Sequence, residues 1–181
     1  MLLDASKASL LVIDIQERLL PAMADAERVV AKTSILMAAA RDLGLPITVS
    51  EQYPKGLGRT VPQLAANDAT VFEKTSFSCW RDAAMKQHFI GQHDGGRPLV
   101  VVAGIEAHVC VLQTCFDLAN AGFGVFAVAD AMSSRASASA ELAFDRLRHA
   151  GVEVVNIEMA LFELLEKAGT PQFKTLSALI R

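Results

Sequence analysis

Cysteine is scarce in this sequence. Only three occur among 181 residues, Cys79, Cys110 and Cys115. An odd number at these spacings fits neither a disulfide framework nor a zinc site. We therefore expect a reducing, cytoplasmic environment, in which each of the three thiols is available for chemistry.

Long apolar runs and an excess of basic charge are also lacking. The first apolar run, residues 10–13, is far too short for a membrane span or a secretory signal. Seventeen Lys and Arg against twenty Asp and Glu give a formal net charge of −3. This charge provides no basic surface for phosphates, so nucleic acid and anionic membranes are poor candidate partners.

Hydrophobic residues, in contrast, are plentiful at 52% of the chain. A chain of this length can bury roughly 70% of its surface on folding. No internal repeat, low-complexity segment or linker interrupts it, so we expect a single domain over residues 1–181.

Apolar segments of strand length alternate with longer helical stretches, which is typical of repeated βα units. The predicted strands are residues 10–14, 46–50, 70–72, 98–103, 124–129 and 152–156. The predicted helices are residues 24–43, 80–89, 108–121, 136–150, 159–168 and 171–179. Continuous Val, Ile and Leu runs favour strands that are covered on both faces, so we predict an α/β, three-layer, doubly wound fold with a six-stranded parallel sheet.

Particular residues mark the expected ends of these helices. Gly44, Gly122 and Gly151 are placed as helix stops, and Ser133 or Ser134 as the cap of the helix at 136–150. The one conspicuous loop is 51–62, and loops of that length are often functional.

Three polar residues lie at or near the carboxyl ends of predicted strands, where doubly wound sheets bind ligands. Burial at the end of residues 10–14 would raise the pKa of Asp14 and suit it to general base catalysis; a turn or capping aspartate is the alternative. Lys74 follows the strand at 70–72, where a solvated lysine is the usual interpretation.

Cys110 is the third residue, near the start of a predicted helix. The helix dipole and free N–H groups there are expected to lower the pKa of the thiol, and the same amides could bind an oxyanion. The alternative is an inert buried thiol, which is how we interpret Cys115 and Cys79. His108 is a rival partner for the thiol, but two residues apart on a helix their side chains point to different sides.

Three segments in order resemble the isochorismatase-like cysteine hydrolases, a family that includes the nicotinamidases. They are residues 11–16 (LVIDIQ), 73–78 (EKTSFS) and 104–111 (GIEAHVCV). The resemblance covers nearly the whole chain. It implies a parallel six-stranded sheet flanked by helices, a catalytic triad of Asp14, Lys74 and Cys110, and a cis peptide between Ile105 and Glu106. It also implies an oxyanion hole made by the backbone N–H groups of Glu106 and Cys110.

The sequence departs from the family pattern in two places. Ala107 and His108 stand where members commonly have Thr and an acidic residue. Residues 51–58 (EQYPKGLG) contain no histidine, whereas nicotinamidases carry an Asp-x-His metal cluster there, so we expect no metal or other cofactor. Residues 51–54, 76–80 and 106–110 are most similar to the isochorismatase-domain subgroup of the family. True isochorismatases lack the cysteine that is found here at position 110. The candidate pocket residues are Gln16, Gln52, Tyr53, Phe77, Trp80 and His108.

The predicted function is hydrolysis of a small amide-type substrate through a thioester on Cys110. A non-catalytic binding or scaffold protein of the same fold is the alternative. A redox role for Cys110 and Cys115 would strain disulfide geometry, because they lie more than one helical turn apart. The resemblance also implies a homo-oligomer, and the apolar stretch 161–165 is either its interface or part of the core.

Overall fold

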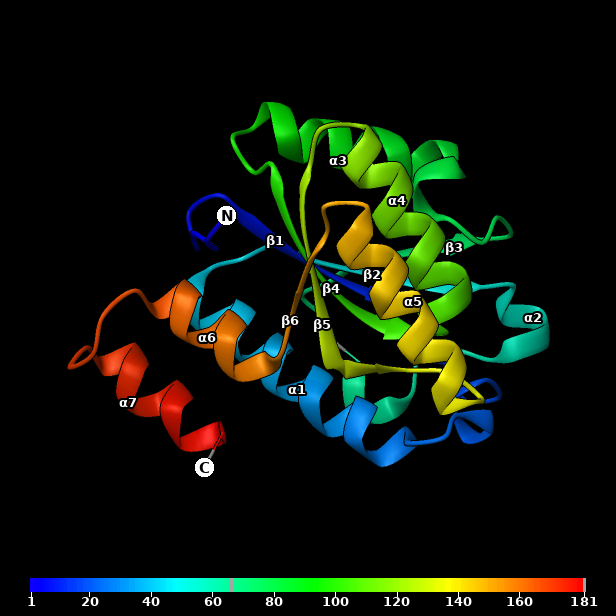
Figure 1. Ribbon diagram of the computed structural model, residues 1–181, viewed down its shortest axis with the longest axis horizontal. Coiled ribbons are helices and arrows are strands. Elements are labelled where there is room, and N and C mark those ends of the chain that lie inside the picture. Colours follow the sequence, from blue (N-terminus) through cyan, green and yellow to red (C-terminus); the bar gives the residue numbers. More distant parts are fainter. Residues whose placement is uncertain (66, 181) are drawn as a thin grey trace.

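The computed structural model describes residues 1–65 and 67–180, and in this part of the chain six strands form one sheet (Figure 1). The strand order is β3-β2-β1-β4-β5-β6, and every neighbouring pair is parallel. The strands are β1 (Ala8–Ile13), β2 (Ile47–Gln52), β3 (Thr70–Lys74), β4 (Leu99–Ile105), β5 (Gly124–Ser133) and β6 (Glu153–Val155). The predicted α/β class with a six-stranded parallel sheet is confirmed.

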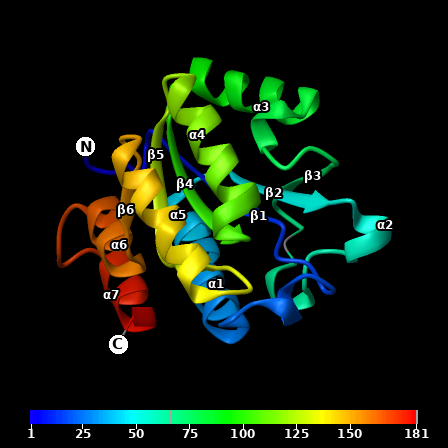
Figure 2. The same ribbon diagram turned by 45° about the vertical axis from the view of Figure 1, so that its right-hand side comes forward.

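Helices cover both faces of this sheet. The α-helices are α1 (Ala26–Leu43), α2 (Pro54–Leu57), α3 (Ala83–Asp94), α4 (Leu112–Asn120), α5 (Ser137–His149), α6 (Ile157–Leu165) and α7 (Pro171–Ser177). Short 3-10 turns form η1 (Leu20–Ala22), η2 (Pro62–Leu64), η3 (Cys79–Arg81) and η5 (Ala178–Ile180), and η4 (Ala107–Val111) is a π-helical turn. Helices α1, α6 and α7 lie on one face of the sheet and α3, α4 and α5 on the other (Figures 1 and 2). One apolar core lies under the first set of helices and a second under the other set.

The two central strands explain why the sequence is so apolar. Every residue of β1 and β4 is buried, whereas β3 at the edge is mostly exposed until its last residue, Lys74. Strands with helices on both faces require apolar side chains in both directions. The continuous runs therefore form the middle of the sheet.

Several predicted boundaries shift. α3 begins at Ala83, capped by the Asp82 side chain, rather than at residue 80. The single helix expected at 108–121 is a π-helical turn followed by α4. The predicted serine cap of α5 is wrong: its N-cap is Ala136, and no side chain caps it. Ser133 instead ends β5, which continues four residues past the predicted strand.

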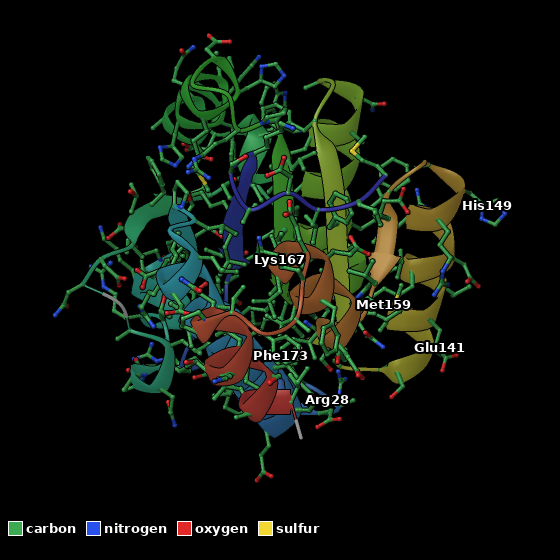
Figure 3. The ribbon with its side chains drawn as sticks, turned by 90° about the vertical axis from the view of Figure 1, so that its left-hand side faces the viewer. Arg28, Glu141, His149, Met159, Lys167 and Phe173 are labelled. Carbon is green, nitrogen blue, oxygen red and sulfur yellow. The ribbon has the colours of Figure 1, made fainter. Side chains whose placement is uncertain are left out.

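The apolar C-terminal stretch is mainly core. Leu161, Leu164 and Leu165 are buried, and only Phe162 is exposed, at 42%. Its ring packs 6.2 Å from that of Phe173 in α7, which is labelled in Figure 3. Most of the stretch proposed from the sequence as an interface is therefore unavailable to a partner. No helix among the described residues is long and apolar enough to cross a membrane.

Candidate active site

Asp14, Lys74 and Cys110 come from segments that end at the same edge of the sheet. Asp14 directly follows β1, Lys74 is the last residue of β3, and Cys110 lies in η4, after β4. The chain winds outward from β1 through β2 and β3, and in the other direction from β4 through β5 and β6. The strand order therefore reverses between β1 and β4, and α/β proteins bind ligands at the carboxyl ends of the strands beside such a reversal.

Asp14 is held by both main-chain and side-chain groups. It is fully buried with φ at +54°, and its N–H donates to the Ser50 carbonyl at 3.0 Å. The Oδ1 atom accepts a hydrogen bond from the Ser50 hydroxyl at 2.7 Å, and Oδ2 accepts one from the Lys74 ammonium at 2.7 Å. Burial raises the pKa of Asp14, partly offset by Lys74 and Ser50, in the direction expected from the sequence.

Lys74 is a buried cation rather than a solvated one. Its side chain is fully buried, and Nζ donates to Gln52 Oε1 at 2.7 Å as well as to Asp14. The carbonyls of Ser76 and Phe77 accept from it at 3.3 and 3.2 Å. Burial alone would lower the pKa of Lys74, but the neighbouring carboxyl and thiol groups outweigh burial and raise it. The lysine therefore stays protonated.

The Cys110 thiol lies next to this ion pair. The residue is 5% exposed, and its thiol is close enough to the Asp14 carboxylate to be affected by its negative charge. Burial, together with the negative charge of Asp14, raises the pKa of the thiol. The expected lowering by a helix dipole is therefore wrong, because a buried thiol beside a carboxylate resists ionisation. At rest Cys110 is a thiol.

The segment before Cys110 presents backbone N–H groups near the thiol. The Glu106 carbonyl accepts hydrogen bonds from the N–H groups of Val109 at 3.0 Å and Val111 at 3.3 Å, but not from Cys110 between them. The Glu106 N–H has no acceptor among the described residues. The Glu106 side chain is held by Arg135, whose Nη2 donates at 2.7 Å and whose backbone N–H donates at 3.0 Å. The peptide bond between Ile105 and Glu106 is cis, as the resemblance implies.

Two of the predicted pocket residues lie against the site. Gln52 accepts from Lys74 and donates through Nε2 to the Thr75 carbonyl at 2.8 Å. Gln16 is fully buried and bonds only main-chain groups: its Nε2 donates to the carbonyls of Gln52 and Gly58 at 3.0 and 2.7 Å. Gln16 therefore fixes the loop after β2 instead of lining an open pocket.

The other pocket candidates are spread more widely. Tyr53 is 55% exposed and lines a cavity of about 360 Å³ that also touches Lys74. Phe77 is 54% exposed. Trp80 packs with its ring 5.7 Å from Phe123 and lines a cavity with residues of α3, so the structure does not bring it to the triad.

The His108 side chain has a neighbour other than the Cys110 thiol. Its Nδ1 lies 2.9 Å from the Ser134 hydroxyl, and its side chain lines a cavity of about 290 Å³ against α5. The side chains of His108 and Cys110, two residues apart in the π-helical turn, therefore have different neighbours: Ser134 for the histidine, and Asp14 and Lys74 for the thiol.

Two buried residues that were not predicted from the sequence, Ser50 and Thr114, contact the candidate triad or its main chain, and a third, Cys79, contacts both of them. Ser50 binds Asp14, Thr114 donates to the Cys110 carbonyl at 2.7 Å, and the Cys79 N–H donates to Thr114 Oγ1 at 3.0 Å. A strand-end argument could have found Ser50, which ends the strand predicted at 46–50. Nothing in the local sequence distinguishes Thr114, because its role depends on a partner 35 residues away.

Replacing Lys74 with methionine is expected to cost about 3–5 kcal/mol of stability, because it leaves Asp14 buried without a cation. Without Lys74 the folded-state pKa of Asp14 rises further above its unfolded value. The deficit should therefore shrink as the pH falls toward the ordinary range of Asp, where the group is protonated in both states. Urea unfolding at several pH values measures this effect, with Asp14→Asn added to Lys74→Met as the control that should recover stability. A Lys74→Met variant as stable as the wild type at neutral pH would contradict the account.

Comparison with known proteins places this arrangement in a family. A model of the Isochorismatase domain matches residues 8–159, and the chain belongs to this family of hydrolases. The secreted isochorismatase effector Isc1 of Phytophthora sojae is 36% identical over 95% of this chain and 83% of its own. The MAR1 ribonuclease structure from Caenorhabditis elegans shares 34% identity at a TM-score of 0.91, covering 99% of this chain and 92% of that one.

A third protein shares the fold alone. The YcaC gene product of Escherichia coli, described as an octameric hydrolase of unknown specificity, is 24% identical. It superposes with a TM-score of 0.91 over 99% of this chain and 90% of its own. Family membership and fold, as the three sequence segments predicted, are thus confirmed.

Proposed function

We propose that the protein is a cysteine-dependent hydrolase that cleaves a small amide-type C–N bond through a thioester on Cys110. The observation that carries this proposal is the buried Asp14 carboxylate, fixed by Lys74 at 2.7 Å beside the Cys110 thiol. A buried ion pair is costly to keep, and a nucleophile next to an oriented base is the arrangement that covalent catalysis requires.

The reaction begins with proton transfer from the Cys110 thiol to Asp14 as the sulfur attacks the carbonyl carbon of the amide. The backbone N–H groups of Glu106 and Cys110 hold the oxyanion that forms, and each such donor is typically worth about 10² to 10³ in rate. Asp14 then gives its proton to the departing nitrogen, which leaves as an amine and yields the thioester. A water molecule that Asp14 deprotonates hydrolyses the thioester and releases the acid.

The raised pKa values of Asp14 and Cys110 suit these steps. A thiol that is protonated at rest does not react indiscriminately, and it needs a base when the substrate arrives. A carboxyl group with a raised pKa is a better general base and acid than an ordinary aspartate. Lys74 remains charged throughout and holds Oδ2, so that Asp14 keeps its orientation.

The pH dependence of Cys110 alkylation by iodoacetamide, followed by peptide mass spectrometry, tests this proposal. Wild-type labelling should fall at low pH as Asp14 becomes protonated, with a midpoint above the ordinary pKa of Asp. Asp14→Asn should lose this limb and label at least about tenfold more slowly at neutral pH, because burial, the main cause of the raised Cys110 pKa, keeps the thiol protonated and Asn cannot take its proton. His108→Ala tests the rival arrangement, a Cys–His dyad. This variant should label within about twofold of wild type, because the His108 ring lies against the Ser134 hydroxyl.

The opposite outcome would favour another function. Labelling of Cys110 as slow as that of Cys79 and Cys115, and unchanged in Asp14→Asn, would support a non-catalytic binding or scaffold protein. Loss of labelling in His108→Ala alone would transfer the role of base to the histidine.

Further expectations accompany this function. We propose that residues 1–181 act as one domain, that the partner is a small molecule, and that the chain forms a homo-oligomer, as the octameric Escherichia coli neighbour does. The Caenorhabditis elegans relative is called a ribonuclease, whereas the net charge of −3 of this chain does not favour an RNA substrate. All three cysteines are free thiols, consistent with the expected cytoplasmic location, although one relative is described as secreted.

A further inference from the structure

We propose that Ser50 and Thr114 are positioning residues that hold Asp14 and Cys110 in line for proton transfer, and that Cys79 joins the two. The inference rests on the proposed function of Cys110. All three residues lie outside the triad. The alignment of Asp14, the base, with Cys110, the nucleophile, then depends on two buried hydroxyl groups.

Ser50 fixes the base. Its carbonyl accepts from the Asp14 N–H at 3.0 Å, and its hydroxyl donates to Oδ1 at 2.7 Å. Because Lys74 holds the other oxygen at 2.7 Å, each oxygen of the carboxylate has its own donor. The carboxylate plane is therefore fixed, and rotation away from the thiol would break one of these two hydrogen bonds.

Thr114 fixes the nucleophile in a similar way. It is fully buried in the first turn of α4, and its hydroxyl donates to the Cys110 carbonyl at 2.7 Å. The same oxygen accepts from the Cys79 N–H at 3.0 Å. The hydroxyl thus uses its single proton for Cys110 and a lone pair for Cys79, and it ties the irregular π-helical turn to a neighbouring segment.

Cys79 connects the two halves. It is fully buried, and its thiol lies 3.6 Å from the Ser50 hydroxyl oxygen. Burial raises the pKa of Cys79 to about 11, so it is a neutral weak donor at neutral pH. A continuous path of contacts therefore runs from Asp14 through Ser50, Cys79 and Thr114 to Cys110.

This path of contacts sets the distance between the Cys110 thiol and the Asp14 carboxylate, over which the proton moves. Asp14 follows β1, Ser50 lies in β2 and Cys79 in η3, whereas Cys110 and Thr114 lie in the adjoining segments η4 and α4. A small misplacement of a reacting group can cost about 10²-fold in rate even when the chemistry is unchanged. The Cys79 link to Thr114 uses the backbone, so Cys79→Ala should disturb the site less than Thr114→Val does.

Iodoacetamide labelling of Cys110 against pH tests the proposal in Ser50→Ala, Thr114→Val and Thr114→Ser. Ser50→Ala removes a hydrogen bond to the ionised carboxylate, so the pKa of Asp14 rises and the acidic limb should move to higher pH. Thr114→Val should keep the wild-type midpoint but lower the plateau about tenfold to a hundredfold. Thr114→Ser, which keeps the hydroxyl, should restore the plateau to within about threefold of wild type.

Matched controls separate positioning from a general loss of packing. Ser9→Ala removes a buried hydroxyl from the other end of the β1 segment, and Thr33→Val removes a buried hydroxyl that has no partner among the described residues. Both should label like the wild type, and urea unfolding midpoints would be recorded for every variant. Ser50→Ala and Thr114→Val with profiles like those of the controls would overturn the proposal. Slow Cys110 labelling in the wild type itself would instead overturn the proposed function.

Discussion

Replacing Cys110 with alanine is expected to abolish turnover of any amide or activated ester that the wild type hydrolyses, by about 10⁴-fold or more. The variant has no sulfur atom that can form the thioester, and it has no thiol from which Asp14 can take a proton. The fold should remain, because the change removes one sulfur atom from a nearly buried position. Hydrolysis of p-nitrophenyl acetate and of a panel of small primary amides measures the effect, with circular dichroism reporting on the fold.

Cys115→Ala is the matched control for this variant. Cys115 is fully buried five residues further along, in α4, and burial raises the pKa of its thiol as well. We expect this variant to retain the activity of the wild type. Equal activity of Cys110→Ala and wild type on every substrate turned over would remove the nucleophile from the account.

Replacing Gly104 with alanine is expected to cost about 5 kcal/mol or more, enough to unfold many domains. Gly104 lies in β4 with φ at +137°, and a Cβ atom there would lie 2.2 Å from the Ile13 carbonyl oxygen. The added Cβ atom would clash with the backbone of Ile13. Neither β1 nor β4 can move to relieve this clash without disturbing both cores. Because Ile13 precedes Asp14, any variant protein that folds should also label poorly at Cys110.

Gly91→Ala provides the contrast. Gly91 lies inside α3, and a Cβ atom there has no neighbour within 4 Å. Alanine is favoured over glycine in a helix by about 1 kcal/mol, so this variant should be slightly more stable. Urea unfolding of both variants tests the difference. A Gly104→Ala protein as stable as wild type would mean that the close approach of β1 and β4 is not required.

The sheet was predictable because its central strands are continuous apolar runs. The predicted ranges 10–14 and 98–103 overlap most of β1 and β4, each of which has two residues outside the prediction. Gly44 ends α1 in a left-handed conformation, as placed from the sequence. The π-helical turn over Ala107–Val111 was not predictable. Its hydrogen-bond pattern depends on the contacts at the end of β4, and residues 108–121 alone favour an ordinary helix.

The positions of Asp14, Lys74 and Cys110 followed from strand ends and from the three family segments. The pKa shifts of these residues could be predicted from the sequence only in part. The raised pKa of Asp14 was predicted, because burial of a carboxylate acts in one direction. The pKa of Cys110 was mispredicted, since a helix start alone does not reveal the carboxylate and the burial that oppose ionisation. The contacts of Ser50, Thr114 and Cys79 needed the tertiary structure.

The central claim is that Cys110 carries the acyl group. Wild-type protein is mixed with p-nitrophenyl acetate, quenched in acid after increasing times, and mapped by peptide mass spectrometry. We expect an acetyl group on Cys110 that forms quickly, then disappears as the thioester is hydrolysed, and forms far more slowly in Asp14→Asn. Acetylation confined to surface lysines, with Cys110 unmodified at every time, would contradict the account.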